Sequence, residues 1–118
     1  MVRKFDLEER LIDFGVQCIK LFVKIEKSYA LDHLSKQLIR SSTGAALNYG
    51  EVQGAESNRD FIHKMGIVLK ELKESRVNFK IQIRAELLKE IALAESSLKE
   101  CEELVAIFAK SIKTAKSK

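Results

Sequence analysis

Residues 91–112, IALAESSLKECEELVAIFAKSI, carry the clearest fold signal in this chain. Their apolar residues recur at alternating steps of three and four, which places them on one face of an α-helix. A stripe of this kind favours packing against other helices at shallow crossing angles. We therefore predict a helix at 88–114. The stripe consists of Ile91, Ala94, Leu98, Cys101, Val105, Phe108 and Ile112.

Three earlier stretches show the same helical period, and we predict further helices at 6–27, 31–52 and 58–84. Each has apolar residues on one face and polar or charged residues on the other. The expected buried stripe of the helix at 58–84 consists of Phe61/Ile62, Met65, Leu69, Leu72, Val77/Phe79 and Ile81/Ile83.

The breaks between the predicted helices differ in clarity. The segment 28–30 interrupts the apolar period, and Ser57 followed by Asp60 is typical of a helix N-terminus. The last break has no Gly or Pro. We place a tight reversal at 85–88, because one helix from 57 to 114 would span ~87 Å at 1.5 Å per residue. Two remaining helices could not shield a rod of that length.

Composition supports an all-α fold. The chain has 118 residues, no Pro and five Gly, so it lacks the turn residues that a β-sandwich or β-barrel needs. Its length suits one domain, residues 1–118. Four helices joined by short connections predict an up-down-up-down antiparallel four-helix bundle.

The location of the protein is also predicted from composition. No apolar run approaches the roughly 18 residues that a membrane span requires, so we expect no membrane partner. The acidic residues Asp6, Glu8, Glu9 and Asp13 do not suit an N-terminal targeting peptide. We therefore expect a cytoplasmic protein.

Catalytic, cofactor and metal motifs are not visible in the sequence. There is no Gly-rich phosphate loop after a strand, and His33 and His63 lie far apart without ligand spacing to the cysteines. Cys18 and Cys101 fall on the apolar stripes, where buried thiols are the simplest interpretation. We expect no cofactor, no metal and no enzymatic activity.

The predicted helix at 31–52 contains six small residues in a row, Ser41-Ser42-Thr43-Gly44-Ala45-Ala46. Gly44 weakens a helix by up to ~1 kcal/mol relative to Ala. Close backbone approach by a neighbour would offset that loss. Ser41, Ser42 and Thr43 have no neighbouring base that would make one of them a nucleophile, and helix packing explains them better.

A polar strip accompanies the small residues. Gln37 and Asn48 lie 11 residues apart, as do Arg40 and Glu51, so each pair shares a face of the helix. One interpretation is hydrogen bonding across helices or between subunits. The other is a ligand or nucleic-acid site.

A basic stripe runs along the predicted helix at 58–84. Residues 59–84 carry seven basic and three acidic side chains, whereas 86–103 carry two basic and six acidic ones. The stripe is either a nucleic-acid surface or a solvated face paired with Glu71, Glu74 or the acidic helix that follows. The candidate nucleic-acid contacts are Lys73, Arg76, Lys80 and Arg84, with Lys113 and Lys116 near the C-terminus.

The order and spacing of several motifs resemble a known family. The run from Gln37 to Glu51, with its ending Asn48-Tyr49-Gly50-Glu51, is followed by Asp60-Phe61-Ile62 and Gly66-Ile67-Val68-Leu69-Lys70-Glu71. The ending Ser111-Ile112-Lys113-Thr114-Ala115-Lys116 is also similar. Together these resemble the four-helix-bundle proteins encoded in intervening sequences of bacterial 23S ribosomal RNA genes.

The resemblance implies a homo-oligomer, commonly a pentamer, for which nucleic-acid binding is the usual proposal and catalysis is not implied. The family's recurring polar residues fall on Gln37, Arg40, Asn48 and Glu51. This sequence departs from the family pattern at three places. Asn78 stands where an aromatic residue is frequent, Glu86 where a glycine often marks the turn, and Val52 where glycine or alanine is usual.

Two hypotheses follow for the function. The first is a non-enzymatic oligomer that presents basic side chains to RNA or DNA. The second is a structural protein whose charge asymmetry serves self-assembly and protein partners. A deep pocket containing Arg40, Asn48 and Glu51 would instead favour an enzyme.

Overall fold

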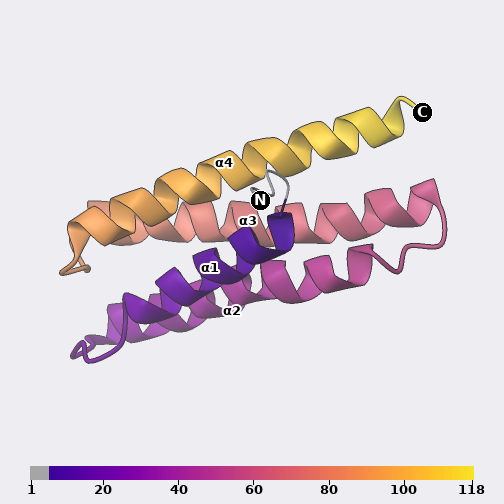
Figure 1. Ribbon diagram of the computed structural model, residues 1–118. Helices are drawn as coiled ribbons and strands as arrows, with labels where there is room; N and C mark the ends of the chain where they lie inside the picture. The colour runs from indigo at the N-terminus through magenta and orange to yellow at the C-terminus, as the bar shows by residue number, and fades with distance from the viewer. Residues whose placement is uncertain (1–5) are drawn as a thin grey trace.

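The computed structural model describes residues 6–118, which form four α-helices and no strand (Figure 1). The predicted all-α class is confirmed. Residues 1–5 of the predicted domain 1–118 lie outside the described range. The helices are α1 (Leu7–Lys20), α2 (Tyr29–Val52), α3 (Asn58–Arg84) and α4 (Ile91–Lys116).

The four helices pack in a closed order around one core. Helix α2 packs against α1 and α3, and α4 packs against α3 and α1. In Figure 1 the α1–α2 and α3–α4 connections lie at one end of the molecule, and the α2–α3 connection lies at the other. Because α1 is much shorter than the other three helices, it covers only part of their length.

Aromatic side chains join the helices that are not direct neighbours. Phe14 of α1 and Phe79 of α3 have ring centroids 6.2 Å apart. Tyr49 of α2 meets Phe108 of α4 edge-on, with centroids 5.5 Å apart. These contacts place both diagonals of the molecule in one continuous apolar core. Other fully buried core residues are Leu11, Cys18, Leu38, Val68, Leu72, Ala94, Cys101 and Leu104.

Helix α1 ends at Lys20 and not at residue 27, so its predicted end is wrong. Leu21 and Phe22 are buried in the turn that follows, and Lys24 has a φ of 64°. The α-helical pattern has already changed at Phe22, whose N–H donates to the Ile19 carbonyl three residues earlier at 3.1 Å, and the left-handed Lys24 follows in the same turn. The apolar period continued past this point because the turn residues also face the core.

Helix α2 begins two residues before its predicted start. Ser28 is its N-cap, with the Ser28 side-chain oxygen accepting a hydrogen bond from the Leu31 N–H at 3.2 Å. Residues 28–30 therefore start α2 and do not simply interrupt the period. Helix α3 spans the range predicted for it, and the Ser57 Oγ accepts a hydrogen bond from the Asp60 N–H at 3.0 Å.

The chain reverses between α3 and α4 without a glycine. Glu86 has a φ of 56° in this connection. The Glu86 N–H donates to the Ile83 carbonyl at 3.1 Å, and the Leu87 N–H donates to the Gln82 carbonyl at 3.0 Å. This pair of hydrogen bonds is the Schellman arrangement that ends many helices. The reversal lies at the predicted place, and α4 starts at Ile91 and not at residue 88.

Candidate functional site

The first half of the polar strip links α2 to α3. The Arg40 guanidinium forms an ion pair with Glu74 and lies 3.6 Å from the Glu71 carboxylate. It also donates a long hydrogen bond of 3.4 Å to the Gln37 side chain. The hydrogen bond to Glu74 raises the pKa of Arg40. Arg40 therefore lies across the α2–α3 groove, bound to two acidic residues.

Gly44 leaves the space that Glu71 occupies. A Cβ atom added at Gly44 would overlap a Glu71 carboxylate oxygen. The expected close backbone approach at Gly44 is therefore wrong, because the neighbour is a side chain. The close approach occurs instead at Gly15 of α1, where an added Cβ would lie 3.6 Å from the Thr43 Cα. The small residues of α2 thus allow contact with both neighbouring helices.

The second half of the strip lines a small depression. The Asn48 side-chain amide donates to the Gly44 carbonyl within α2 at 2.8 Å. Asn48 and Glu51 line an open depression of about 200 Å³ together with His63, Lys64 and Ile67 of α3. Arg40 is not part of its lining. The predicted strip is therefore divided into an ion-paired region and a shallow depression.

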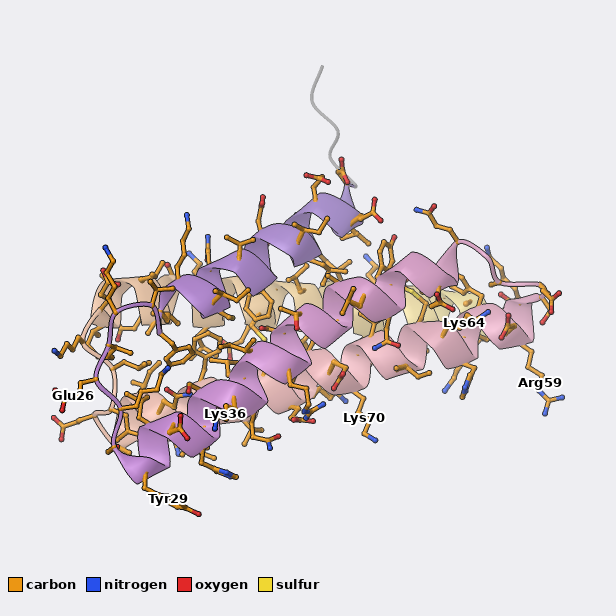
Figure 2. All side chains as sticks on the ribbon, turned by 90° about the horizontal axis from the view of Figure 1, so that it is seen from below. Glu26, Tyr29, Lys36, Arg59, Lys64 and Lys70 are labelled. Carbon is orange, nitrogen blue, oxygen red and sulfur yellow. The ribbon has the colours of Figure 1, made fainter. Side chains whose placement is uncertain are left out.

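Lys64 at the edge of this depression is paired within its own helix. Its Nζ lies 2.8 Å from the Asp60 carboxylate, one turn earlier in α3. The hydrogen bond from Lys64 lowers the pKa of Asp60. In Figure 2 the Lys64 side chain lies along the surface of α3 at the end where Arg59 is found.

The structure buries a series of polar side chains on α2 and α3. Packing was expected for Ser41, but the periodicity did not predict burial of Ser75, Asn78 and Gln82 on α3. The hydroxyl groups of Ser41 and Ser75 are 2.7 Å apart. The Asn78 amide donates to the Leu34 carbonyl at 3.0 Å, and the Gln82 amide donates to the Asn78 side-chain oxygen at 2.6 Å. The side-chain oxygen of Gln82 has no hydrogen-bond partner within residues 6–118.

The predicted apolar stripe of α3 left the choice open within the pairs Val77/Phe79 and Ile81/Ile83, and the structure places Phe79 and Ile83 against the core. Val77 and Ile81 are exposed, whereas Ser75, Asn78 and Gln82 are buried at those levels of the helix. Ser75, Asn78 and Gln82 follow steps of three and four, so their spacing was the available signal. Polar side chains are not expected in a core unless they have hydrogen-bond partners there. The partners of these residues belong to another helix or to an adjacent turn, so the sequence pattern did not show them.

The basic stripe of α3 is divided by its neighbours. Lys73 and Arg84 are exposed, and Arg76 and Lys80 are partly buried. The Lys80 Nζ lies 4.0 Å from the Glu102 carboxylate of α4. Lys80 therefore follows the alternative interpretation, pairing with the acidic helix.

The basic residues near the C-terminus have a different environment. Lys113 and Lys116 are exposed in the last turns of α4, and no ion pair links either to an acidic residue within residues 6–118. Lys110 and Lys113 border an open depression that also involves Ser117. Lys113 and Lys116 are therefore two neighbouring exposed basic side chains at one end of α4.

A comparison with protein families identifies the chain. The model of the 23S rRNA-intervening sequence protein family matches residues 3–110. The chain belongs to this family. No curated protein matches it.

The solved structures include a match to this family member. A protein of unknown function from the S23 ribosomal protein family of Bacteroides thetaiotaomicron VPI-5482 has a similar structure, with a TM-score of 0.79. The two sequences are 29% identical, and the match covers 91% of this chain and 98% of that chain. The fold is therefore shared along nearly the full length of both proteins.

The two cysteines of this family member are buried in the core. Burial raises the pKa of both Cys18 and Cys101 to about 12. The Cys101 thiol donates to the Leu72 carbonyl at 3.2 Å. Both thiols therefore stay protonated near neutral pH, which does not suit nucleophilic chemistry.

The described part of the chain shows neither a metal-binding cluster nor a membrane-spanning helix. Residues 6–118 contain no group of three His, Cys, Asp or Glu side chains placed to hold a metal ion. None of the four helices is both long enough and apolar enough to cross a bilayer.

Proposed function

We propose that this member of the 23S rRNA-intervening sequence protein family is a non-enzymatic, cytoplasmic homo-oligomer that binds RNA or DNA through exposed basic side chains. The oligomer, with the pentamer as its commonest form, is what the family resemblance implies. The observation that carries the nucleic-acid proposal is the exposure of Lys113 and Lys116 without acidic partners among the described residues. Such side chains are free to exchange their counterions for phosphates.

The proposal distinguishes between the predicted basic residues. Lys73 and Arg84 are also exposed, but they flank the apolar Val77 and Ile81 on α3, so the C-terminal lysines are the main candidates. Arg40 and Lys80 are less suitable, because acidic residues of a neighbouring helix already compensate their charge. Arg76, which lies between Lys73 and Lys80 along α3, is partly buried.

The proposed topology is the up-down-up-down antiparallel bundle. Support comes from the alternation of the three connections between the two ends of the molecule (Figure 1). In this topology α4 presents its C-terminal lysines beside the N-terminus of α3, and the Asn58 amide donates to the Ala115 carbonyl at 2.8 Å there. That contact holds the basic end of α4 against the bundle.

A salt titration tests the proposal. The purified protein is titrated into labelled 23S ribosomal RNA fragments and duplex DNA, and binding is followed by fluorescence anisotropy from ~50 to ~200 mM salt. We expect binding that weakens steeply with salt. The doubly substituted variant Lys113→Glu/Lys116→Glu should bind more weakly, with a salt slope smaller by about 0.7–0.9 for each phosphate that the protein no longer neutralises.

The matched control makes the same charge change elsewhere. Lys36 and Lys70 are exposed on α2 and α3, and Figure 2 shows Lys70 extending away from its helix. Lys36→Glu/Lys70→Glu should retain most of the binding. Equal losses in the two double variants would show that net charge, and not the end of α4, governs binding. An absence of binding at ~50 mM salt would refute the nucleic-acid proposal.

The second candidate function is a structural protein that binds other proteins. It is favoured by apolar side chains that α1, α2 and α3 expose to solvent. If the oligomer forms but retains no nucleic acid, this candidate replaces the first.

A further inference from the structure

Helix α1 exposes a row of apolar side chains on the side that faces away from the core. Ile12, Val16 and Ile19 are each about two-fifths exposed, and Leu47 of α2 beside them is 76% exposed. We call these four residues the α1 patch. A groove of about 210 Å³ runs through it, lined almost entirely by apolar atoms and floored by Gly15, Thr43 and Ala46.

Helix α3 exposes a second group, Val77 and Ile81, one turn apart. Val77 is 53% exposed, and we call the two residues the α3 patch. Phe79 and Ile83, the sequence alternatives to these two residues, are the ones that face the core. Clusters of exposed apolar side chains are typical of contact surfaces.

The two patches lie at one level of the molecule. Phe14 and Phe79 touch across the core, so they mark the same height in α1 and α3. Ile12 and Val16 stand two residues before and after Phe14, and Val77 and Ile81 stand two residues before and after Phe79. Two residues of helix correspond to ~3 Å of rise. The apolar pairs are therefore level with each other to within a few ångströms.

The patches lie on different sides of the bundle, because the groove of the α1 patch is shared with Thr43, Ala46 and Leu47 of α2, whereas the α3 patch belongs to α3 alone. Helices α1 and α3 each pack on α2 and α4, and their backbones do not pack on each other. Their outward faces therefore point in different directions. A second copy that is rotated about an axis parallel to the bundle, without a shift along it, can bring its α3 patch onto the first copy's α1 patch.

The charges around the patches are complementary. Glu9 and Asp13 are exposed beside the α1 patch, and Lys73 and Arg84 are exposed on either side of the α3 patch. No ion pair within residues 6–118 uses these four side chains. Lys20, at the C-terminal end of α1, is a basic residue near the otherwise acidic α1 patch. Opposite charges around an apolar centre set the orientation of a contact and disfavour other ones.

From the level, the exposure and the charge of the two patches, we infer that the α1 patch of one copy packs on the α3 patch of a second copy. This inference rests on the proposed homo-oligomer and assigns its contact surface. The two patches differ, so the contact is heterologous, and every copy in the assembly uses one of each. A heterologous contact closes into a ring when its rotation divides a full turn, and otherwise continues as an open row of copies.

Two single substitutions test the inference. Leu47→Glu changes the α1 patch and Val77→Glu changes the α3 patch, and both sites are exposed enough for the monomer to fold. Each variant should lose self-association by at least about tenfold, because a carboxylate replaces an apolar contact at the interface. The assembly mass is measured by light scattering and native mass spectrometry, with circular dichroism as the check on folding.

Mixing the two variants gives the sharper result. A Leu47→Glu copy retains a native α3 patch, and a Val77→Glu copy retains a native α1 patch. One intact contact can therefore form in the mixture and cannot propagate, so we expect heterodimers with the mass of two chains. Folded variants that both dissociate but do not pair on mixing would overturn the heterologous contact.

The control is Tyr29→Glu, at the most exposed large apolar side chain of the described chain (89%). Figure 2 shows Tyr29 pointing into solvent at the first turn of α2. This variant should keep the wild-type mass, and its dissociation would overturn the assignment of the patches. Wild-type mass in both patch variants would also overturn the assignment of the patches, but it would not contradict the proposed oligomer. A monomeric wild type overturns the oligomer as well, and the RNA and DNA titration reports on nucleic-acid binding independently.

Discussion

Helices α2 and α4 both pack on α3, but they do so with different side chains. Three of the residues that α2 buries are serines, whereas α4 buries one serine among larger apolar residues. The buried residues of α2 are Leu31, Ser35, Leu38, Ser41, Ser42, Ala45 and Val52. Those of α4 are Ala94, Ser97, Cys101, Leu104, Val105, Phe108 and Ala115.

The difference shows that small polar residues in a helix can be packing residues. The α2 face contacts α3 through the Ser41–Ser75 hydroxyl pair, the Asn78 amide and the Arg40 ion pairs. The α4 face contributes apolar area to the core. The two interfaces of α3 thus differ in what stabilises them. Hydrogen bonds and ion pairs contribute at the α2–α3 interface, and burial of apolar surface contributes at the α3–α4 interface.

The largest effect is expected from Phe108→Ala on α4. Phe108 is fully buried and meets Tyr49, so its truncation removes apolar contacts and leaves a cavity. The free energy of unfolding should fall by about 3–5 kcal/mol, measured by urea denaturation. Tyr29→Ala, at a site that is 89% exposed and outside both patches, should change it by less than about 0.5 kcal/mol. Similar losses in both variants would contradict the assignment of the core to this face.

A smaller loss is expected from Asn78→Ala, on the face of α3 that meets α2. The substitution removes the donor to the Leu34 carbonyl and the acceptor of the Gln82 amide. Buried polar groups without partners should lower the free energy of unfolding by about 1–3 kcal/mol. Asn48→Ala is the matched control, because Asn48 bonds only to its own helix. An equal loss at Asn48 would argue against a special role for the buried amides.

A gain of stability is expected from Glu86→Gly, which changes the connection to α4 without changing the buried face of α4. Glu86 has a φ of 56°, a conformation that disfavours side chains by roughly 1–2 kcal/mol. The variant should be more stable by about 1 kcal/mol, seen as a higher unfolding midpoint in urea. Lys89→Gly, in the same connection but not among the residues of positive φ, should give no such gain.

The smallest effect is expected from the serine pair. The Ser41 and Ser75 oxygens also lie 3.3 and 3.0 Å from carbonyl oxygens of their own helices, so the hydroxyl that does not donate across the pair can donate within its helix. Each Ser→Ala substitution should therefore lower the free energy of unfolding by about 0.5–1 kcal/mol. The double variant should lose less than the sum, because removing both partners leaves no hydroxyl unpaired. Additive losses would mean that the two hydroxyls stabilise the protein separately.

The helices themselves were largely predictable from sequence, and their ends were less so. The range of α3 agreed with the structure because a capping serine marks its start. Helix α1 was predicted too long, since Leu21 and Phe22 stay buried after the helix has ended. A buried apolar residue gives the same sequence pattern whether it lies in a helix or in a turn. Only the backbone conformation distinguishes the helix from the turn.

The candidate site was predictable as a set of residues but not as a set of contacts. Periodicity placed Gln37, Arg40, Asn48 and Glu51 on adjacent strips of one helix. It could not show that Arg40 pairs with Glu71 and Glu74, because these residues lie some thirty positions away in the chain. It also left Val77/Phe79 and Ile81/Ile83 open as alternatives for the core, and it gave no sign that Ser75 and Asn78 are buried.

The sequence by itself determined the all-α class, the approximate helix positions and the family, because local periodicity and motif order are properties of the chain. Tertiary structure decided which basic residues are compensated, which polar residues are buried and which apolar residues face solvent. The physical reason is that burial and pairing depend on what the neighbouring helices bring to the same place. In α3 those neighbours buried the polar Asn78 and left the apolar Val77, one position earlier, in contact with water.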